Sequence, residues 1–546
     1  MESSPLRIKK NKKKKSPKLD KSALVNEIIN EQQELKRKKK DKNSVELKPS
    51  KKMKKVEQTN GNANNHNETI QNFTINFNNG LKNVSTPVKL NQIPSKKGEI
   101  KSSEDSIESG KNMFQWVIDP IKVNTFMEKH WEKKYLHVKR SNPDYYKHLM
   151  SITTIDTILK NNDMEYTKNI DITSYVNGER DTKNPSGRAK SSEVWDFYEE
   201  GCSIRILNPQ TYIPEVYKMD AVIQEYFHCM TGTNVYLTPP NSQGFAPHYD
   251  DIEAFVLQVE GKKHWRLYNP RNENEVLPRE SSENFDQSEI GSPILDVILE
   301  PGDLLYFPRG FIHQANTVPG FYSLHITLSV YQKQSYGDFF EQLVAGAVQE
   351  TIENDVEFRQ GLPLDFHRNL GLVYSDQDNP RRKELIDKIK RMFKKLADNL
   401  PIDDAADKIA KNYQHDALPP YLSEEERKLT TFSSDFKVAE NGGVEFGTLI
   451  EEDSQVKLLK ANILRMVTEE NAIRLYYHVD NSKVYHDKDP LFLEIDEIDS
   501  PSVAMLINEY PNYVTVSELH EESERAVAVA QDLYDCGLLM KKPDSE

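Results

Sequence analysis

Two histidines and one aspartate carry the clearest chemistry in this sequence. His248 and Asp250 stand one residue apart, and His313 follows much later, after a Gly-Asp turn at 302–303 and a Pro-x-Gly turn at 308–310. Two imidazoles and one carboxylate on one face of a metal ion leave three coordination positions open, which is the arrangement of non-haem Fe(II) oxygenases. The three residues therefore predict a metal site that activates dioxygen.

The spacing around these residues predicts how they meet. Residues i and i+2 of a strand point to the same face, so His248 and Asp250 can reach one metal ion while Asp251 faces away. The pattern G-x5-P-x-G-x2-H over residues 302–313 predicts a turn, a strand, a second turn and a strand that begins with His313. It resembles the second signature box of the cupin superfamily, whose double-stranded β-helix brings His313 beside His248. The alternative is that these histidines are core or surface residues without a ligand role.

The hydrophobic pattern predicts three folded parts. Short strands separated by Gly and Pro turns between Ser203 and Ser329 predict an all-β barrel or sandwich. From residue 336 onward, apolar residues recur at helical spacing, which predicts a helical block up to 418. Those helices either pack on the β-domain or form a dimer interface, and the sequence leaves both open. Residues 419–546 begin at a Pro-Pro boundary and mix short strands with helices, which predicts a small α+β domain.

The segment between the metal-ligand candidates predicts a hairpin. Apolar residues on both sides of Gly261 indicate two strands, at 254–260 and 264–268, joined by a glycine-centred turn. Alternation along the second strand places Lys263 on the same face as Trp265, directed inward. A buried cation at this position would suit a buried carboxylate.

Two further histidines lie near these segments. His264 has the opposite strand parity from Lys263, and His325 lies on the last predicted strand of the barrel. We expect both to form hydrogen bonds in the core rather than to bind a metal ion or a ligand.

Four segments together resemble a known family, the JmjC oxygenases. They are 234–240, 248–251, 260–268 and 308–315, and within that family they are most similar to the ribosomal oxygenases, the nucleolar histidyl-hydroxylase branch. The resemblance runs from about residue 113 to 546. It implies a mainly β fold with helices: a JmjC double-stranded β-helix, a helical dimerisation domain and a C-terminal winged-helix-like domain. These would occupy residues 111–335, 336–418 and 419–546.

The resemblance also implies roles for eight residues. His248, Asp250 and His313 match the iron ligands. Lys263 matches the lysine that pairs with the distal carboxylate of 2-oxoglutarate, and Asn234 aligns with a residue near the same cosubstrate. An unpaired buried charge costs several kcal/mol, so a buried carboxylate requires such a cation. Three further positions resemble the lining of the substrate cleft, although each could equally be a structural strand residue: Arg205, Tyr236 and Ser329.

The implied reaction is a hydroxylation that uses Fe(II), 2-oxoglutarate and dioxygen. Two substrates come with the resemblance: a histidine of a large-subunit ribosomal protein, hydroxylated at its β-carbon, and N-methyl-lysine in histone tails, which is demethylated. We expect the first, because the resemblance includes the helical and C-terminal domains, and we keep the second as another reaction. A different class is a non-catalytic cupin-like adaptor in chromatin or ribosome assembly. An adaptor of that class would need a damaged triad, whereas all three ligands are present.

Charge is distributed unevenly along the chain. Residues 1–55 hold 20 Lys or Arg against 7 Asp or Glu, so this segment carries +13 and the rest of the chain −27, for a total of −14. We expect residues 1–110 to be disordered, because they offer no periodic apolar residues. The lysine runs within 12–15 and 36–40 are interpreted as nuclear or nucleolar targeting signals, or alternatively as a solvated tail.

The negative charge of residues 56–546 limits the kinds of partner that we expect. It suits a basic protein substrate, and it argues against direct nucleic-acid binding by the folded body, including residues 419–546. The longest apolar runs, such as 343–348, are far shorter than a membrane span. The beginning of the chain has no apolar signal region, so we do not expect secretion. Three widely spaced cysteines fit a reducing compartment.

Overall fold

The computed structural model describes residues 103–433, 437–438, 440–445, 449–485 and 487–543. The predicted basic tail, 1–110, therefore lies outside the described residues except for its last part. That last part is ordered rather than disordered, because helix α2 (Ser106–Ile118) begins inside it. The Asp105 side chain caps this helix by accepting a hydrogen bond from the Ile107 N–H. Gly110 lets α2 approach α6 (Pro214–Phe227) closely, since a Cβ atom at Gly110 would lie 2.7 Å from the Val222 carbonyl oxygen. Gly110 is thus a packing residue.

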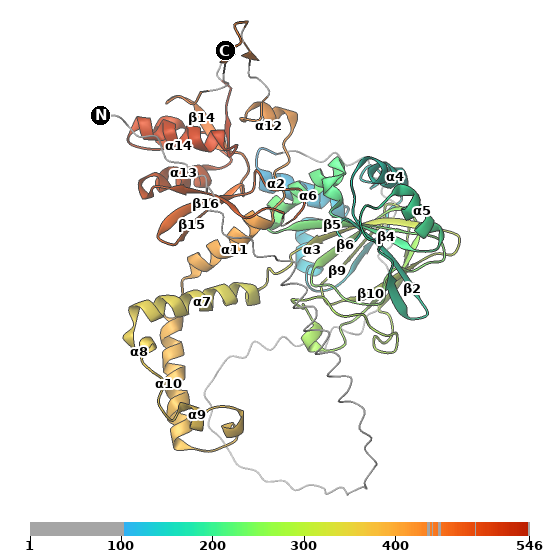
Figure 1. Cartoon of the computed structure of the whole chain (residues 1–546), viewed down its shortest axis with the longest axis horizontal. Helices are drawn as coiled ribbons and strands as arrows, with labels where there is room; N and C mark the ends of the chain where they lie inside the picture. The colour runs from blue at the N-terminus through green and yellow to red at the C-terminus, as the bar shows by residue number, and fades with distance from the viewer. Residues whose placement is uncertain (1–102, 434–436, 439, 446–448, 486, 544–546) are drawn as a thin grey trace. The chain divides into compact units, whose positions relative to one another are not determined.

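Two antiparallel sheets form the β-domain (Figure 1). The larger has the strand order β1-β9-β6-β11-β5-β4-β2-β3, and the smaller has the order β10-β7-β8. The strands of the larger sheet, in chain order, are β1 (Leu136–Val138), β2 (Ile170–Val176), β3 (Glu179–Thr182), β4 (Ser203–Leu207), β5 (Thr231–Thr238), β6 (Glu253–Gly261), β9 (Leu304–Phe307) and β11 (Ser323–Val330). Those of the smaller sheet are β7 (Lys263–Tyr268), β8 (Leu295–Leu299) and β10 (Ile312–Thr317).

The predicted hairpin around Gly261 is wrong in its pairing. Strands β6 and β7 are consecutive, but β6 pairs with β9 and β11 while β7 pairs with β10 and β8, so the chain turns a corner from one sheet to the other. Gly261 makes this corner with φ +64°, and a Cβ atom there would lie 1.9 Å from the Tyr322 carbonyl oxygen. The corner places Lys263 at the start of the second sheet, facing the first.

Helices cover the larger sheet on the side away from the smaller one. An aromatic cluster joins these helices to the sheet: Phe126 of α3 (Val123–Lys129) contacts Phe114 of α2 and Tyr306 of β9 at ring-centroid distances of 5.5 and 4.8 Å. All three side chains are fully buried. The remaining helices of this part are α3 (Val123–Lys129), α4 (Ile152–Asn161), α5 (Ser191–Glu199) and α6 (Pro214–Phe227).

The helical block begins at Ser335, whose side chain caps α7 in a capping box with Asp338. Its elements are α7 (Tyr336–Asn354), α8 (Val356–Arg359), α9 (Phe366–Asn369), α10 (Pro380–Ala397) and α11 (Ile402–Asp416). α7 packs against α10 and α11. The apolar periodicity is only partly buried, because Leu343 and Leu385 lie inside whereas Phe340 and Phe393 are 50% and 59% exposed.

The C-terminal part has its own apolar core, which includes Val456, Leu506 and Ala530. Its sheets have the strand orders β12-β13, β18-β14-β19 and β15-β16-β17. Its elements are α12 (Glu424–Lys428), β12 (Lys437–Val438), β13 (Val444–Glu445), β14 (Gln455–Leu458), β15 (Leu464–Glu469), β16 (Ala472–Tyr477), β17 (Leu491–Ile495), α13 (Ser500–Glu509), β18 (Val514–Thr515), α14 (Ser523–Asp535) and β19 (Leu539–Lys541). Among the helices of the described residues, none has the length and apolar character needed to cross a membrane.

Candidate metal centre

His248 and His313 face each other through two backbone hydrogen bonds. The His313 N–H donates to the His248 carbonyl at 2.8 Å, and the His248 N–H donates back at 3.3 Å. This is an isolated bridge, so the strand predicted at 248–250 is not formed. The neighbouring backbone N–H groups of Tyr249 and Asp251 donate to serine side chains instead of to a strand, which explains the irregular backbone. The side chains still converge.

The three predicted ligand side chains meet at one point. Nε2 of His248 lies 3.7 Å from Oδ1 of Asp250, and Nε2 of His313 lies 3.6 Å from Oδ2. One ligand atom from each of the three residues lies within 4.8 Å of the other two. Gly310, in the turn before His313, donates its backbone N–H to the Asp250 carbonyl at 3.1 Å, which ties the two halves of the site together.

The histidine rings are oriented as metal ligands are. Nδ1 of His248 lies 2.8 Å from the Ala246 carbonyl oxygen, and Nδ1 of His313 lies 3.2 Å from that of Phe311. A carbonyl that accepts the Nδ1 proton leaves the Nε2 lone pair for a metal ion. Burial, and after it the neighbouring His248, lowers the pKa of His313 to about 4, so this imidazole is neutral near pH 7. These residues therefore fit a divalent metal ion.

Asp251, the competing carboxylate, turns away as expected. Its two side-chain oxygens accept hydrogen bonds from Ser281 at 2.6 Å and from Gln332 at 2.8 Å. The third ligand position therefore belongs to Asp250.

A cavity of about 420 Å³ opens beside the three residues, between the two sheets. This volume suits a small organic acid together with one protein side chain. The structure brings all eight predicted site residues to its walls: Arg205, Asn234, Tyr236, His248, Asp250, Lys263, His313 and Ser329.

Lys263 lies at the buried end of this cavity and is only 5% exposed. It shares the inward face of β7 with Trp265, as the alternation predicts, whereas Lys262 reaches outward to Glu300 at 2.7 Å. Its Nζ donates to Thr238 Oγ1 at 3.2 Å, and no carboxylate of the described residues pairs with it. Burial lowers the pKa of Lys263 to about 7. Sequence reasoning missed Thr238, although it shares strand parity with Asn234 and Tyr236 on β5.

The four remaining predicted residues lie on neighbouring strands. Arg205 of β4 forms an ion pair with Asp171, and its guanidinium lies 5.5 Å from the centre of the Phe245 ring. Asn234 and Tyr236 are on β5, and Ser329 is on β11. The pairing of these strands sets all four side chains on the cavity side, where their roles remain predictions.

The prediction of hydrogen bonding in the core is confirmed only in part for the two further histidines: His264 forms a hydrogen bond outside the core, and His325 is buried but leaves one ring nitrogen without a partner among the described residues. His264 lies on the outer face of the smaller sheet, partly exposed and paired with Asp296, because the strand alternation turns it away from the core. His325 is 2% exposed but lines the cavity, and its Nδ1 has no hydrogen-bond partner among the described residues. The strand parity that it shares with Ser329 could have placed it there.

Comparisons with known proteins agree with this fold. The family profile described as "JmjC domain" matches residues 205–338, and "Ribosomal oxygenase 1, C-terminal winged helix domain" matches residues 418–543. The protein from Culex quinquefasciatus named "Bifunctional lysine-specific demethylase and histidyl-hydroxylase NO66" is 53% identical over 441 residues, which are 81% of this chain and 68% of that protein. "Ribosomal oxygenase 1" of Gallus gallus is 46% identical over 81% of this chain and 74% of its own length.

Among solved structures, the Escherichia coli ribosomal oxygenase YcfD in complex with cobalt and 2-oxoglutarate matches at 15% identity, with a TM-score of 0.40, over 78% of this chain and 99% of that chain. The family assignment rests on the sequence relatives, which confirm the resemblance seen in the four motif segments and the predicted fold class. The chain belongs to the JmjC-domain ribosomal oxygenases.

Proposed function

We propose that the protein is a 2-oxoglutarate-dependent oxygenase that hydroxylates a basic protein substrate. One observation carries the proposal. A two-histidine, one-carboxylate cluster opens into a cavity whose buried end holds a lysine without a carboxylate partner among the described residues. This combination needs a metal ion at one end and an organic acid at the other.

In this proposal, one set of residues binds the metal ion and another binds the cosubstrate. His248, Asp250 and His313 would hold Fe(II), and the carbonyls behind the two rings keep their Nε2 atoms directed at it. Lys263 and Thr238 would bind the distal carboxylate of 2-oxoglutarate, with Asn234 beside the same molecule. Ferrous iron with 2-oxoglutarate and dioxygen supplies the oxidising chemistry. The apolar walls formed by Trp265 and Phe307 keep bulk water from that end.

For the substrate, the favoured candidate is a histidine of a large-subunit ribosomal protein, with methyl-lysine in histone tails as the second. The names of the relatives include both a histidyl hydroxylase and a lysine demethylase, which supports keeping the two reactions. The net charge of −27 over residues 56–546 favours a basic peptide in either case. A nuclear or nucleolar location follows from such substrates and from the lysine runs of the tail. Action on histones would make the protein a chromatin and transcription regulator.

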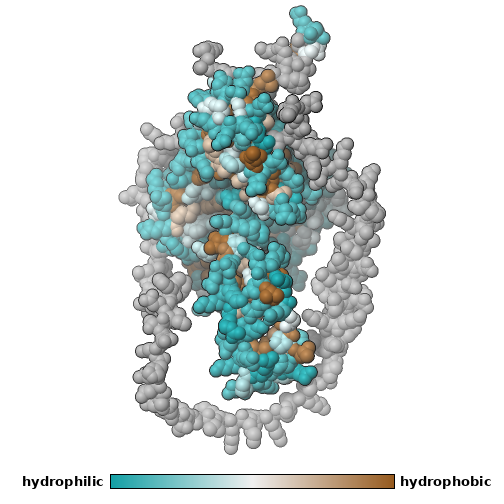
Figure 2. Space-filling model, turned by 90° about the vertical axis from the view of Figure 1, so that its left-hand side faces the viewer, coloured by the Kyte–Doolittle hydropathy of each residue, from teal (hydrophilic) through white to brown (hydrophobic). Residues whose placement is uncertain are grey.

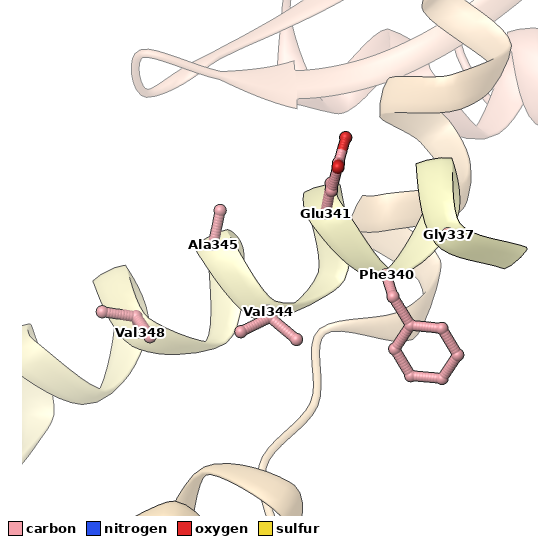
Figure 3. A pocket seen from close by; sticks show the side chains of 6 residues that line it. All are labelled: Gly337, Phe340, Glu341, Val344, Ala345 and Val348. Carbon is pink, nitrogen blue, oxygen red and sulfur yellow. The ribbon is translucent and has the colours of Figure 1, made fainter. Parts of the chain in front are cut away.

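The helical block, in the same proposal, forms a homodimer. Phe340 and Val344 point to the same side of α7 and line a shallow groove (Figure 3), together with Gly337, Glu341, Ala345 and Val348. Ile389 and Phe393 on α10 are also exposed apolar side chains, and contiguous apolar surface marks contacts between proteins. Apolar patches interrupt the hydrophilic surface of the face shown in Figure 2.

The proposed function is tested by intact-mass analysis of candidate peptides after incubation with the purified protein, Fe(II) and 2-oxoglutarate. A gain of one oxygen atom on a histidine peptide, with one succinate formed per event, supports hydroxylation. Loss of a methyl group from a methyl-lysine peptide supports demethylation. The adaptor alternative predicts peptide binding with neither mass change and no succinate.

A further inference from the structure

His325 sits in the cavity wall without a polar partner for one of its ring nitrogens. The residue lies on β11, where its neighbours across the sheet are Tyr236 on β5 and Gln258 on β6. Its side chain is 2% exposed and lines the cavity, and Nδ1 is unpartnered among the described residues. Buried polar groups in proteins are nearly always hydrogen-bonded, so this imidazole calls for an explanation.

Two aromatic rings hold the imidazole in place. Tyr236 stacks on it with a centroid distance of 4.9 Å and an angle of 4° between the planes. Trp265, from the opposite sheet, meets it edge-on at 5.5 Å and 81°. These two contacts fix the orientation of the imidazole ring, as a residue that positions a ligand requires.

The register of β5 and β11 places His325 at the lysine end of the cavity. Thr238, which accepts the hydrogen bond from Lys263, is the Cα partner of Ser323, and the next pair on the same face is Tyr236 with His325. Thr238 and His325 are therefore diagonal neighbours, within reach of one bound group. The cleft residue Ser329 pairs with Gly232, two same-face pairs further along the ladder.

A neutral His325 imidazole suits a carboxylate whose charge Lys263 already balances. Burial, and after it the nearby Lys263, lowers the pKa of His325 well below its usual range. The imidazole is then neutral and offers one N–H donor. One ammonium, one hydroxyl and one neutral donor together suit a single carboxylate.

We propose that His325 is a positioning residue for the cosubstrate, donating a ring N–H hydrogen bond to the carboxylate that Lys263 pairs with. This rests on the proposed function, since it assumes that a 2-oxo dicarboxylate occupies the cavity. Thr238 and Lys263 would supply the charge-assisted contacts, and His325 would fix the direction of the carboxylate and so help to select the chain length of the acid.

The test measures binding without turnover. The Kd of 2-oxoglutarate is determined by calorimetry on the full chain loaded with Mn(II) under anaerobic conditions. His325→Phe keeps a ring between Tyr236 and Trp265 but removes the donor, so we expect the Kd to rise about tenfold, as for the loss of one hydrogen bond to a charged group. His325→Asn restores a donor and should recover most of the affinity, while the Mn(II) affinity without the acid stays unchanged in both variants.

A shorter acid separates this role from a structural one. 2-Oxobutyrate lacks the distal carboxylate, so its Kd should be the same for wild type and His325→Phe. Equal loss for both acids, or an unchanged Kd for 2-oxoglutarate in His325→Phe, would overturn the inference while leaving the proposed function intact. If the wild-type protein with bound metal does not bind 2-oxoglutarate, both fail. Should His325→Phe not fold, the same comparison between the two acids is made with His325→Asn and His325→Gln.

Discussion

At the scale of single residues, the site depends on how burial changes what each side chain can do. His313 is neutral because it is buried, and neutral imidazole is the form that binds metal. Lys263 is buried without a carboxylate partner among the described residues, so the fold retains a cation that only a ligand can match. The unpaired ammonium is costly to bury, so a bound carboxylate should stabilise the fold around Lys263.

Removing the lysine should weaken cosubstrate binding selectively. Lys263→Ala takes away a charge-assisted hydrogen bond to a buried carboxylate, so the Kd of 2-oxoglutarate should rise at least about tenfold. Calorimetry on metal-loaded protein measures this. Lys262→Ala is the matched control, because that side chain pairs with Glu300 on the outside and should leave the Kd unchanged. An unchanged Kd in Lys263→Ala contradicts the assignment.

The same lysine predicts a pH dependence. Burial lowers its pKa to about 7, and a bound carboxylate favours the ammonium form. Below pH 7 the lysine is already charged, whereas above pH 7 binding must take up a proton. The affinity for 2-oxoglutarate should therefore fall by up to about tenfold per pH unit above 7. Calorimetry at pH 8 in buffers of different ionisation enthalpy should show proton uptake, and an affinity independent of pH from 6 to 9 would rule this out.

At the scale of elements, the corner between β6 and β7 carries the lysine into the cavity. The backbone of Gly261 has a positive φ, and the Tyr322 carbonyl lies where a Cβ would be. The following strand then presents Lys263 and Trp265 inward.

Gly261→Ala should disrupt this corner. The free energy of unfolding, measured by urea titration, should fall by about 2 kcal/mol or more, because both the backbone conformation and the contact with Tyr322 are lost. Gly178→Ala is the control: its φ is also positive, at +85°, but nothing lies within 4 Å of the added Cβ. It should cost only the backbone strain, about 1 kcal/mol. Equal losses in both variants would show that the close approach to Tyr322 is unimportant.

The sequence predicts those parts of the site that depend on local periodicity. Strand alternation correctly places Lys263 inward with Trp265, and the turn pattern at 302–313 brings His313 to His248. Strand pairing is not local, so the corner at Gly261 reads as a hairpin. Strand parity could have put Thr238 and His325 on the cavity side, but not beside Lys263, because that nearness depends on the register between β5 and β11 and on the packing of two sheets.

At the scale of the whole molecule, the described residues combine a catalytic β-domain, a helical block with exposed apolar side chains and a C-terminal winged helix. The apolar faces of the helices could pack on the β-domain or on a second chain. We propose that they pack on a second chain. Side chains that pack on their own domain would not remain half exposed.

Introducing a charge into the α7 groove should dissociate the dimer. Phe340→Glu places a carboxylate among apolar side chains, so light scattering on the full chain should give the mass of one chain where the wild type gives two. Val176→Glu, at an exposed apolar position of β2, should leave the dimer intact. A wild-type protein that is monomeric at micromolar concentration contradicts the proposed interface.

The most direct test of the central claim is the metal content of the triad variants. Wild-type protein reconstituted anaerobically with Fe(II) should hold one iron per chain. His313→Ala, checked for its fold by circular dichroism, should lose affinity by more than the 10- to 100-fold typical of an outer partner of a metal ligand. His264→Ala, on the outer face of the sheet, should bind like the wild type. A folded His313→Ala that retains one iron per chain with wild-type affinity would contradict the assignment of His248, Asp250 and His313 as the metal site.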